Sequence, residues 1–163
     1  MRITDNFVFF WGDFLSNWTA SPIVYEDKNF PTSEHLFMFL KAQYFNDSDV
    51  AFQILLSESP KEAKKLGRKV KGFDEQIWSN YRETAMEISV YAKFAQNPDL
   101  RDMLLDSKYD NKIFVESSPF DRIWGIGFRE EDGPENFISE WGLNLLGKII
   151  NKVRERLKDE FTD

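Results

Sequence analysis

Signals for the start and end of helices recur through most of this chain. Thr32 can cap a helix, and Ser59-Pro-Lys-Glu62 combines a capping box with Pro at the first helical position. Asp74 opens a long predicted helix, and Asn97-Pro98 ends that helix and caps the next one. The predicted helices span about residues 32–44, 48–56, 59–67, 74–96, 97–106 and 141–158. A chain with so many helix boundaries is expected to fold mainly as α-helix.

The predicted β structure is small. Residues 7–11 and 22–25 are short runs of aromatic and branched side chains that bracket turn-forming residues, which predicts a small sheet or hairpin. Residues 113–115 favour one more strand. Because the sequence shows no repeat, no low-complexity segment and no linker, residues 1–163 are predicted to form a single domain. We expect a mainly α fold with a small β element.

Composition narrows the classes of function. The chain has 163 residues, 42% hydrophobic and 16% aromatic, which is enough for one buried core. It has no cysteine, which excludes disulfides and thiolate metal sites and fits a reducing compartment. No apolar run approaches the ~20 residues of a membrane span, so we expect a cytoplasmic protein with no membrane partner. The net charge of −7 argues against stable binding of duplex nucleic acid but is compatible with a small anionic ligand.

Glu34 is the first candidate catalytic residue. It lies in the first turn after Thr32, where a carboxylate often does no more than interact with the helix dipole. Glu34, Met38 and Lys41 share one helical face, however, so that a carboxylate and an ammonium flank an apolar stripe. Two such groups can converge on a pocket and change each other's pKa. His35 projects about 100° away from Glu34, and a lone His is more often structural than catalytic.

A second candidate site is the run Ser118-Pro-Phe-Asp-Arg-Ile-Trp-Gly-Ile-Gly. Asp121, Arg122, Trp124 and Gly125 bring a carboxylate, a guanidinium, an indole and a permissive backbone close together. A turn is the simpler explanation, because Pro and Asp favour turns. An indole beside glycines also suits the wall of a pocket for a planar ligand. We predict that this run contacts a ligand.

Further candidate binding residues are scattered along the chain. The amide of Asn17 offers two donors and an acceptor to a sugar or a phosphate, although an ordinary turn Asn would look the same. Arg82, Met86, Val90 and Lys93 approximate one stripe of a helix, with Trp78 one turn earlier. The stripe is equally typical of basic heads on apolar stems in solvent. The remaining cationic candidate is Arg68, just after Gly67.

These runs together resemble the NADAR family, the YbiA-like N-glycosidases. The ordered matches cover about residues 7 to 150, and no single motif is decisive. They are Phe14-Leu-Ser-Asn-Trp-Thr-Ala-Ser-Pro-Ile, the run from Asn29 to Ala42, Ala63-Lys-Lys-Leu-Gly-Arg68, Lys93-Phe-Ala-Gln-Asn-Pro-Asp-Leu100, the Asp121 run and Asn144-Leu-Leu-Gly147. The resemblance implies an α+β single domain that hydrolyses an N-glycosidic bond to ribose. Members carry a Glu-His pair at the place of Glu34 and His35, and the match around Asn17 implies a binding residue there.

Chemistry of this kind suits the candidate residues. Breaking the C1′–N bond develops oxocarbenium character, so a carboxylate near C1′ stabilises charge and orients water. We assign Glu34 or Asp121 to that role, and Lys41 to electrostatic help or proton donation to the departing nitrogen. If Glu34 and Asp121 act jointly, they must face one cavity. The residues expected to bind substrate are Asn17, Arg68, Trp78, Arg82, Lys93, Arg122, Trp124 and Gly125, with the tryptophans stacking on the base and the cations holding phosphate. The scheme needs no metal and no cofactor.

Several substrates remain open. Resemblance to YbiA-like members implies ribosylaminopyrimidine 5′-phosphates, which are early riboflavin intermediates. Other NADAR members are thought to remove ADP-ribose from guanine bases of nucleic acid. A non-catalytic ADP-ribose or nucleotide binder would use the same Trp and Arg residues without turnover. The predicted partner is therefore a small phosphorylated riboside or an ADP-ribosyl substrate.

Overall fold

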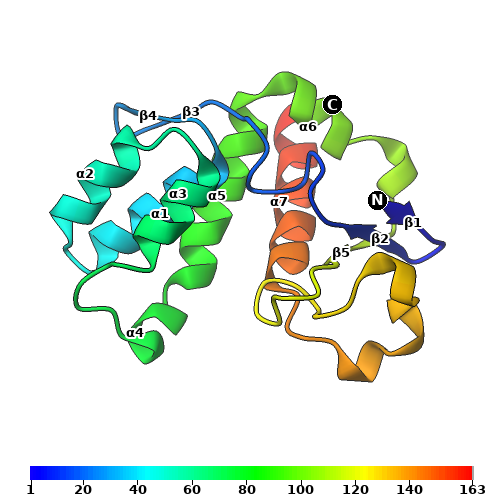
Figure 1. The fold of residues 1–163 in the computed structure, drawn as a ribbon. Helices are drawn as coiled ribbons and strands as arrows, with labels where there is room; N and C mark the ends of the chain where they lie inside the picture. Colours follow the sequence, from blue (N-terminus) through cyan, green and yellow to red (C-terminus); the bar gives the residue numbers. More distant parts are fainter. Residues whose placement is uncertain (163) are drawn as a thin grey trace. The chain divides into compact units, whose positions relative to one another are not determined.

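The computed structural model describes residues 1–162 of the chain, which form two compact units. Within the described residues, 1–16 and 102–162 make up the sheet unit, and Asn17–Arg101 make up the helical unit. The predicted mainly α fold with a small β element is confirmed, because seven α-helices and two small sheets lie within the described residues (Figure 1). None of the helices in residues 1–162 is long and apolar enough to cross a membrane.

The helical unit is built around α1 (Ser33–Tyr44), which packs against three other helices. Every residue from Ser33 to Leu40 is buried, as expected for a helix covered on all sides. The other elements of the unit are α2 (Ser48–Leu56), α3 (Pro60–Gly67), α4 (Glu75–Ser79), α5 (Arg82–Gln96), β3 (Ile23–Tyr25) and β4 (Lys28–Phe30). Helix α6 (Pro98–Leu104) follows and crosses the division between the units.

The predicted caps begin the helices where the sequence places them. Thr32 Oγ1 accepts a hydrogen bond from the His35 amide (3.2 Å), and Ser59 Oγ accepts one from the Glu62 amide (3.1 Å). Asp74 Oδ1 does the same for the Ile77 amide (3.0 Å). A side-chain acceptor satisfies an amide that has no partner within the helix, which is why such residues start helices. These helix starts are therefore confirmed.

The single long helix predicted for residues 74–96 is wrong. The structure has α4 and α5 instead, separated by Asn80 and Tyr81. The break allows the Tyr81 ring to stack on Tyr44, with centroids 4.3 Å apart, while Trp78 is buried beside both rings. These aromatic contacts with Tyr44, a residue far away in the sequence, outweigh the helical propensity of residues 74–96. Asn97-Pro98 separates α5 from α6 as predicted, and Asn97 Nδ2 donates to the Lys93 carbonyl at the end of α5 (2.8 Å).

The predicted strands at residues 7–11, 22–25 and 113–115 are confirmed, but the first two do not pair with each other as a hairpin. Strand β2 (Phe7–Phe10) lies between β1 (Arg2–Ile3), antiparallel, and β5 (Ile113–Glu116), parallel. Strand β3 pairs with β4 through a tight turn in which Glu26 and Asp27 both have positive φ. Such a turn normally carries Asn-Gly or Asp-Gly, so Glu26-Asp27 does not indicate a hairpin turn at this position. The apolar run of β2 fits its central position, because both of its edges are paired.

Helix α7 (Leu145–Phe161) covers the outer edge of β5, and two Asn side chains replace a neighbouring strand. Asn144 Oδ1 accepts from the Glu116 amide (3.0 Å), and its Nδ2 donates to the Phe114 carbonyl (3.0 Å). Asn151 Oδ1 accepts from the Phe114 amide (3.0 Å), and its Nδ2 donates to the Lys112 carbonyl (3.1 Å). These bonds satisfy backbone groups that an open sheet edge would expose. Asn144 has a left-handed φ of 51°, so α7 begins at Leu145 and not at the predicted residue 141.

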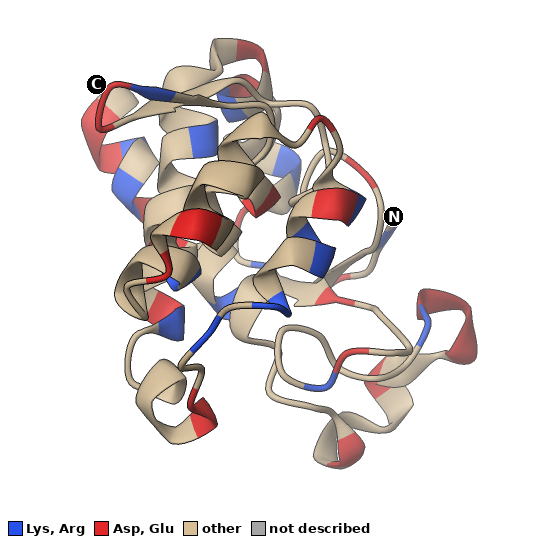
Figure 2. Ribbon diagram, turned by 60° about the vertical axis from the view of Figure 1, so that its left-hand side comes forward, with Lys and Arg blue, Asp and Glu red and all other residues tan. Residues whose placement is uncertain are grey.

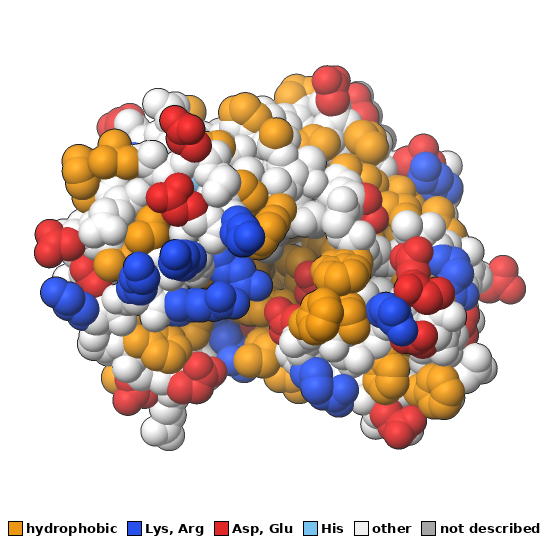
Figure 3. All heavy atoms as spheres, viewed as in Figure 1, with side chains coloured by type: hydrophobic (Ala, Val, Ile, Leu, Met, Phe, Trp, Pro, Cys, Tyr) orange, Lys and Arg blue, Asp and Glu red, His pale blue; other side chains and the backbone are white. Residues whose placement is uncertain are grey.

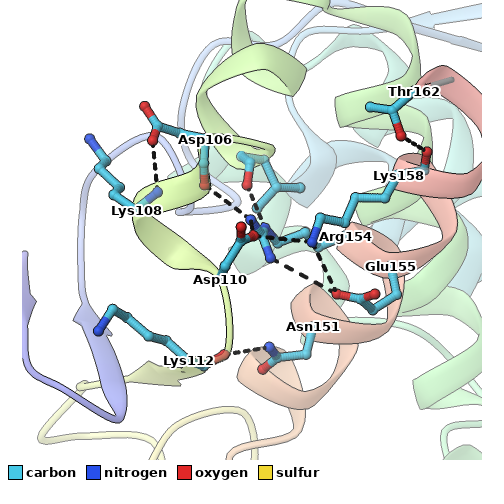
Figure 4. A network of polar contacts seen from close by, with 10 residues as sticks. Asp106, Lys108, Asp110, Lys112, Asn151, Arg154, Glu155, Lys158 and Thr162 are labelled. Carbon is cyan, nitrogen blue, oxygen red and sulfur yellow. Dashed lines mark hydrogen bonds and ion pairs between the residues drawn. The ribbon is translucent and has the colours of Figure 1, made fainter.

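A buried guanidinium fixes the middle of α7 to the preceding chain. Arg154 is 3% exposed; its Nε donates to the Leu104 carbonyl (2.8 Å) and its Nη2 contacts Asp110 Oδ1 (2.6 Å). Lys158 also reaches Asp110 (3.1 Å), and the two cations lower the pKa of the Asp110 carboxyl (Figure 4). Towards the labelled C-terminus, the exposed side of α7 carries both basic and acidic residues (Figure 2). The predicted amphipathic helix is thus held by apolar packing and by this polar network.

His35 joins the start of α1 to the end of α2. Its Nε2 lies 3.1 Å from the Ser57 carbonyl and therefore donates, which leaves Nδ1 to accept from the Thr32 hydroxyl (2.7 Å). Both ring nitrogens are used in the neutral form. Burial accordingly lowers the pKa of His35, with the Ser57 bond opposing the shift. The structural role expected for a lone His is supported by these contacts.

We expect stability to fall as the pH drops below about 6.5, the ordinary His value. Because the pKa of His35 is lowered on folding, its contribution is complete above the unfolded pKa and is lost between that value and the folded pKa. Urea unfolding of wild type and His35→Gln from pH 7.5 to 5.0 measures this effect. The wild-type free energy of unfolding should fall by up to about 1.4 kcal/mol per pH unit more steeply than that of the variant. Parallel curves would contradict this assignment.

Candidate functional site

Helix α1 carries the two groups that the sequence places on one face. Glu34 is only 7% exposed, and its amide donates to the Asn17 carbonyl (3.1 Å). Lys41 is half-buried, two turns further along α1. The charge of Glu34 raises the pKa of Lys41, so the two groups interact electrostatically in the folded unit. A carboxylate and an ammonium on this face are therefore electrostatically coupled.

The environment of Lys41 favours loss of its proton. Burial is the largest influence and lowers its pKa; the nearby Glu75 and Glu34 raise the pKa, and Arg68 lowers it further. The net shift is downward, which brings Lys41 closer to the range in which a lysine can exchange protons near neutral pH. Lys41 Nζ lies 4.5 Å from the centroid of Phe73 and 5.9 Å from that of Trp78. The ammonium thus sits among aromatic rings and three charged groups.

Close packing of α1 and α3 brings Arg68 to this region. A side chain at Gly67 would place its Cβ 2.1 Å from Met38 Sδ, so the last turn of α3 packs closely against Met38. Met38 lies between Glu34 and Lys41 on the shared face of α1, and Arg68 caps the end of α3. Arg68 follows this contact directly, and its charge lowers the pKa of Lys41. The predicted involvement of Arg68 in phosphate binding stays a prediction.

Asn17 uses its amide to hold the start of α1. Its Oδ1 accepts from the Ser33 hydroxyl (2.8 Å), and its Nδ2 lies 3.3 Å from Met86 Sδ on α5. Its carbonyl also accepts from the Glu34 amide, so Asn17 holds both Ser33 and Glu34 in the first turn of α1. These contacts support a positioning function, and a contact with substrate remains a prediction.

Trp78 and Arg82 lie on either side of the break between α4 and α5. Trp78 is 6% exposed, with ring contacts to Phe37 (5.6 Å) and Tyr44 (6.3 Å), which favours packing over stacking on a substrate base. Arg82 Nη1 forms an ion pair with Glu75 Oε1 (3.2 Å), and its side chain is 15% exposed. Since Glu75 also acts on Lys41, Arg82 joins the same charged group of residues. Lys93, further along α5, is fully buried, with Nζ 5.0 Å from the Phe94 centroid.

The second candidate run forms a well-fixed loop in the sheet unit. Asp121 Oδ1 accepts from the amides of Ile123 and Trp124, each at 2.9 Å, as a turn-forming Asp does. Arg122 is exposed, and its Nη2 donates to the Glu140 carbonyl (2.8 Å). Gly125 is buried, and its carbonyl accepts from the Asn144 amide (3.2 Å). Trp124 is half-buried at the same turn.

The structure therefore gathers the sequence candidates into two groups. Glu34, Lys41, Arg68 and Arg82 are linked through the charges around Lys41 in the helical unit. Asp121, Arg122, Trp124 and Gly125 share the loop of the sheet unit. Joint action of Glu34 with Asp121 stays a prediction.

Two residues of the Lys41 environment were missed by sequence reasoning. Glu75 follows the cap Asp74, where an acidic residue is routinely explained by the helix dipole. Phe73 precedes that cap in a polar segment and is 43% exposed. No periodic pattern connects either residue to Lys41, because their proximity depends on how α4 packs beside α1.

The sequence model of the NADAR domain matches residues 9–158, across both units. The chain belongs to the NADAR family. Curated relatives include protein irg-1 of Caenorhabditis elegans, which is 40% identical over 131 residues, 78% of this chain and 61% of that protein. N-glycosidase R617 of Acanthamoeba polyphaga mimivirus is 34% identical, with 93% of this chain and 96% of that protein covered. N-glycosidase YbiA of Escherichia coli is 33% identical, with 92% and 84% covered.

The fold is shared with a solved structure of the family. The NMR structure of Escherichia coli YbiA matches with a TM-score of 0.76 and 30% identity, covering 98% of this chain and 89% of that one. A more distant relationship extends to the maize chloroplastic riboflavin biosynthesis protein PYRR, which is 30% identical over 88% of this chain but only 23% of that protein. The α+β architecture expected from the sequence is confirmed by the YbiA match.

Proposed function

We propose that this NADAR-family N-glycosidase hydrolyses the bond between ribose and an amine nitrogen in a phosphorylated ribosylamine. A ribosylaminopyrimidine 5′-phosphate, an early riboflavin-pathway intermediate, is the proposed example. The names of R617 and YbiA support the type of bond, and the name of the maize protein supports the substrate class. The observation that carries the chemistry is the buried Glu34 on the same helix as Lys41, a half-buried lysine whose pKa burial lowers and the charge of Glu34 raises.

In the proposed reaction, water attacks C1′ while the C1′–N bond breaks. Glu34 orients the water and takes its proton, and its negative charge stabilises the developing oxocarbenium ion. Protonated Lys41 donates a proton to the departing nitrogen, so the amine leaves neutral. Glu34 then releases to solvent the proton that it took from water, and Lys41 takes one up, so both groups return to their starting charges. A lysine with a lowered pKa gives up its proton more readily than an ordinary one, which suits this role.

The rest of the substrate is assigned to the remaining candidates. Arg68 and Arg82 are the proposed phosphate ligands in the helical unit, because both belong to the charged group around Lys41. Asp121 has one carboxylate oxygen occupied by its turn, and its role in catalysis stays a prediction. Arg122, Trp124, Lys93, Trp78 and Asn17 stay predicted binding residues.

A second substrate class is favoured by one observation. Exposed cations are concentrated in the segment that follows and includes α3, although the whole chain carries a net charge of −7. On the face drawn in Figure 3, Lys and Arg side chains gather in the region of α1 and α3. The exposed cations of this segment are Lys61, Lys64, Lys65, Arg68, Lys69 and Lys71. They exceed what one phosphate needs, which supports ADP-ribosylated guanine as an alternative substrate.

The deciding experiment compares three compounds in one assay. Purified protein is incubated with a ribosylaminopyrimidine 5′-phosphate, with NAD and with an oligonucleotide containing ADP-ribosylated guanine, and the released base and sugar phosphate are quantified. We expect release of ribose 5-phosphate from the first compound. Release of ADP-ribose alone would select the second substrate class, and binding without release would contradict the proposed hydrolase.

Trp124→Ala is expected to weaken ligand binding by roughly 1–3 kcal/mol, the range for loss of base–aromatic stacking. The half-buried indole lies in a loop whose backbone is fixed by Asp121, so it is well placed to present one face. Calorimetric titration with the substrate analogue measures the affinity, and Trp124→Phe provides the control that keeps an aromatic face. If affinity is unchanged while the melting temperature falls sharply, Trp124 is a core residue and the stacking assignment fails.

A further inference from the structure

Phe73 is an exposed aromatic residue whose ring contacts the ammonium of Lys41. It is 43% exposed, and Lys41 Nζ lies 4.5 Å from its centroid. The ring also makes an edge contact with Phe45, with centroids 5.4 Å apart. Phe52 on α2 is more exposed, at 61%, but within the described residues it makes no aromatic or cation contact. Phe73 therefore differs from an ordinary surface phenylalanine by its contact with Lys41.

The segment that carries Phe73 is tied to the rest of the helical unit. Asp47 caps α2 through Oδ1, which accepts from the Val50 amide (3.1 Å), while its Oδ2 accepts from the Lys71 amide (2.8 Å). These bonds lower the pKa of the Asp47 carboxyl, which keeps it charged and able to hold both amides. Val70, just before Lys71, is 7% exposed and anchors the same segment. Phe73 is thus presented by fixed backbone despite its exposure.

We propose that Phe73 is a positioning residue that holds the Lys41 ammonium against its ring face and so fixes where Lys41 delivers its proton. The proposal rests on the proposed role of Lys41 as proton donor. A ring face attracts a cation through its quadrupole, and within about 6 Å the attraction is significant. The long side chain of Lys41 would otherwise sample many rotamers, so this contact selects one position for its charged end.

The ring acts on Lys41 in two opposing ways. Its quadrupole favours the protonated ammonium, whereas its bulk excludes water and favours the neutral amine. The other charged groups that act on Lys41 are Glu34 from α1, Arg68 from the end of α3 and Glu75 from α4. Two substitutions at position 73 separate the two effects of the ring. Phe73→Leu keeps the apolar bulk and removes the quadrupole, and Phe73→Ala removes both.

The pKa of Lys41 can be measured directly by NMR titration of protein labelled at the lysine side chains, with Lys41→Arg identifying the signal. We expect the pKa of Lys41 in Phe73→Leu to lie roughly 0.5 unit below the wild-type value, because the cation–ring attraction is lost. In Phe73→Ala the pKa should be higher than in Phe73→Leu, because water reaches the ammonium. Phe52→Leu serves as the matched control and should leave the Lys41 titration unchanged.

An unchanged Lys41 pKa in Phe73→Leu would overturn the proposal, as would the same shift in Phe52→Leu. Because Leu retains most of the apolar contact, that variant decides the matter even if Phe73→Ala fails to fold. The titration needs no substrate, so it remains decisive if the enzyme hydrolyses none of the tested compounds. Where turnover is observed, the alkaline limb of kcat should move with the measured pKa while KM changes little. A limb that stays in place would contradict Lys41 as the proton donor and leave the Phe73 contact intact.

Discussion

Glu34→Gln should fold as the wild type does and turn over substrate at least ~100-fold more slowly, the lower end of general acid–base catalysis. The amide has the shape of the carboxylate but can neither accept a proton from water nor stabilise a cationic sugar by charge. Glu34 is buried at the start of α1, and its negative charge supports the protonated form of Lys41. The substitution should therefore also lower the pKa of Lys41.

The competing explanation is a carboxylate that only stabilises the helix start, which is worth about 0.3–1 kcal/mol. Glu62→Gln is a matched control, because Glu62 is also an acidic first-turn residue but lies exposed on α3. Single-turnover kinetics separate chemistry from product release, and thermal melting reports the fold. If Glu34→Gln keeps near-normal turnover with normal melting, as Glu62→Gln should, Glu34 is only a helix-end charge.

The features predicted correctly from the sequence are those determined within a few residues. Thr32, Ser59 and Asp74 each cap a helix because their partners lie three residues away. The shared face of Glu34 and Lys41 follows in the same way from helical periodicity. Long-range pairing gave the errors. The pairing of β2 with β5 joins residues more than 100 positions apart, and no local pattern distinguishes it from a hairpin with residues 22–25.

The same contrast between local features and features that depend on the fold applies to the candidate site. Lys41 itself was identifiable from its spacing, but its lowered pKa depends on burial and on Glu75, which no motif places beside it. The break between α4 and α5 places Trp78 and Tyr81 beside Tyr44. It could not be predicted from the sequence, because Asn80 and Tyr81 do not themselves exclude helix. Propensity is outweighed there by aromatic contacts between separate helices. Site chemistry could thus be proposed from sequence, whereas its electrostatic tuning required the fold.

Gly147→Ala should destabilise the protein by roughly 2–4 kcal/mol. Helical propensity alone predicts the opposite sign, because Ala is favoured over Gly within a helix by about 1 kcal/mol. In α7, however, a Cβ at this position would lie 2.1 Å from the Phe114 carbonyl oxygen and 2.5 Å from Asn144 Oδ1. The first of these atoms is backbone of β5, so the helix must move away from the strand.

Movement of α7 would break the hydrogen bonds that Asn144 makes with the β5 backbone, leaving buried polar groups unsatisfied. Urea denaturation of the variant measures the loss, and Lys148→Ala, at the exposed neighbouring position of α7, is the control for altered propensity. Amide exchange at Glu116 should accelerate in Gly147→Ala and stay unchanged in the control. A variant as stable as the wild type would mean that α7 and β5 separate at little cost.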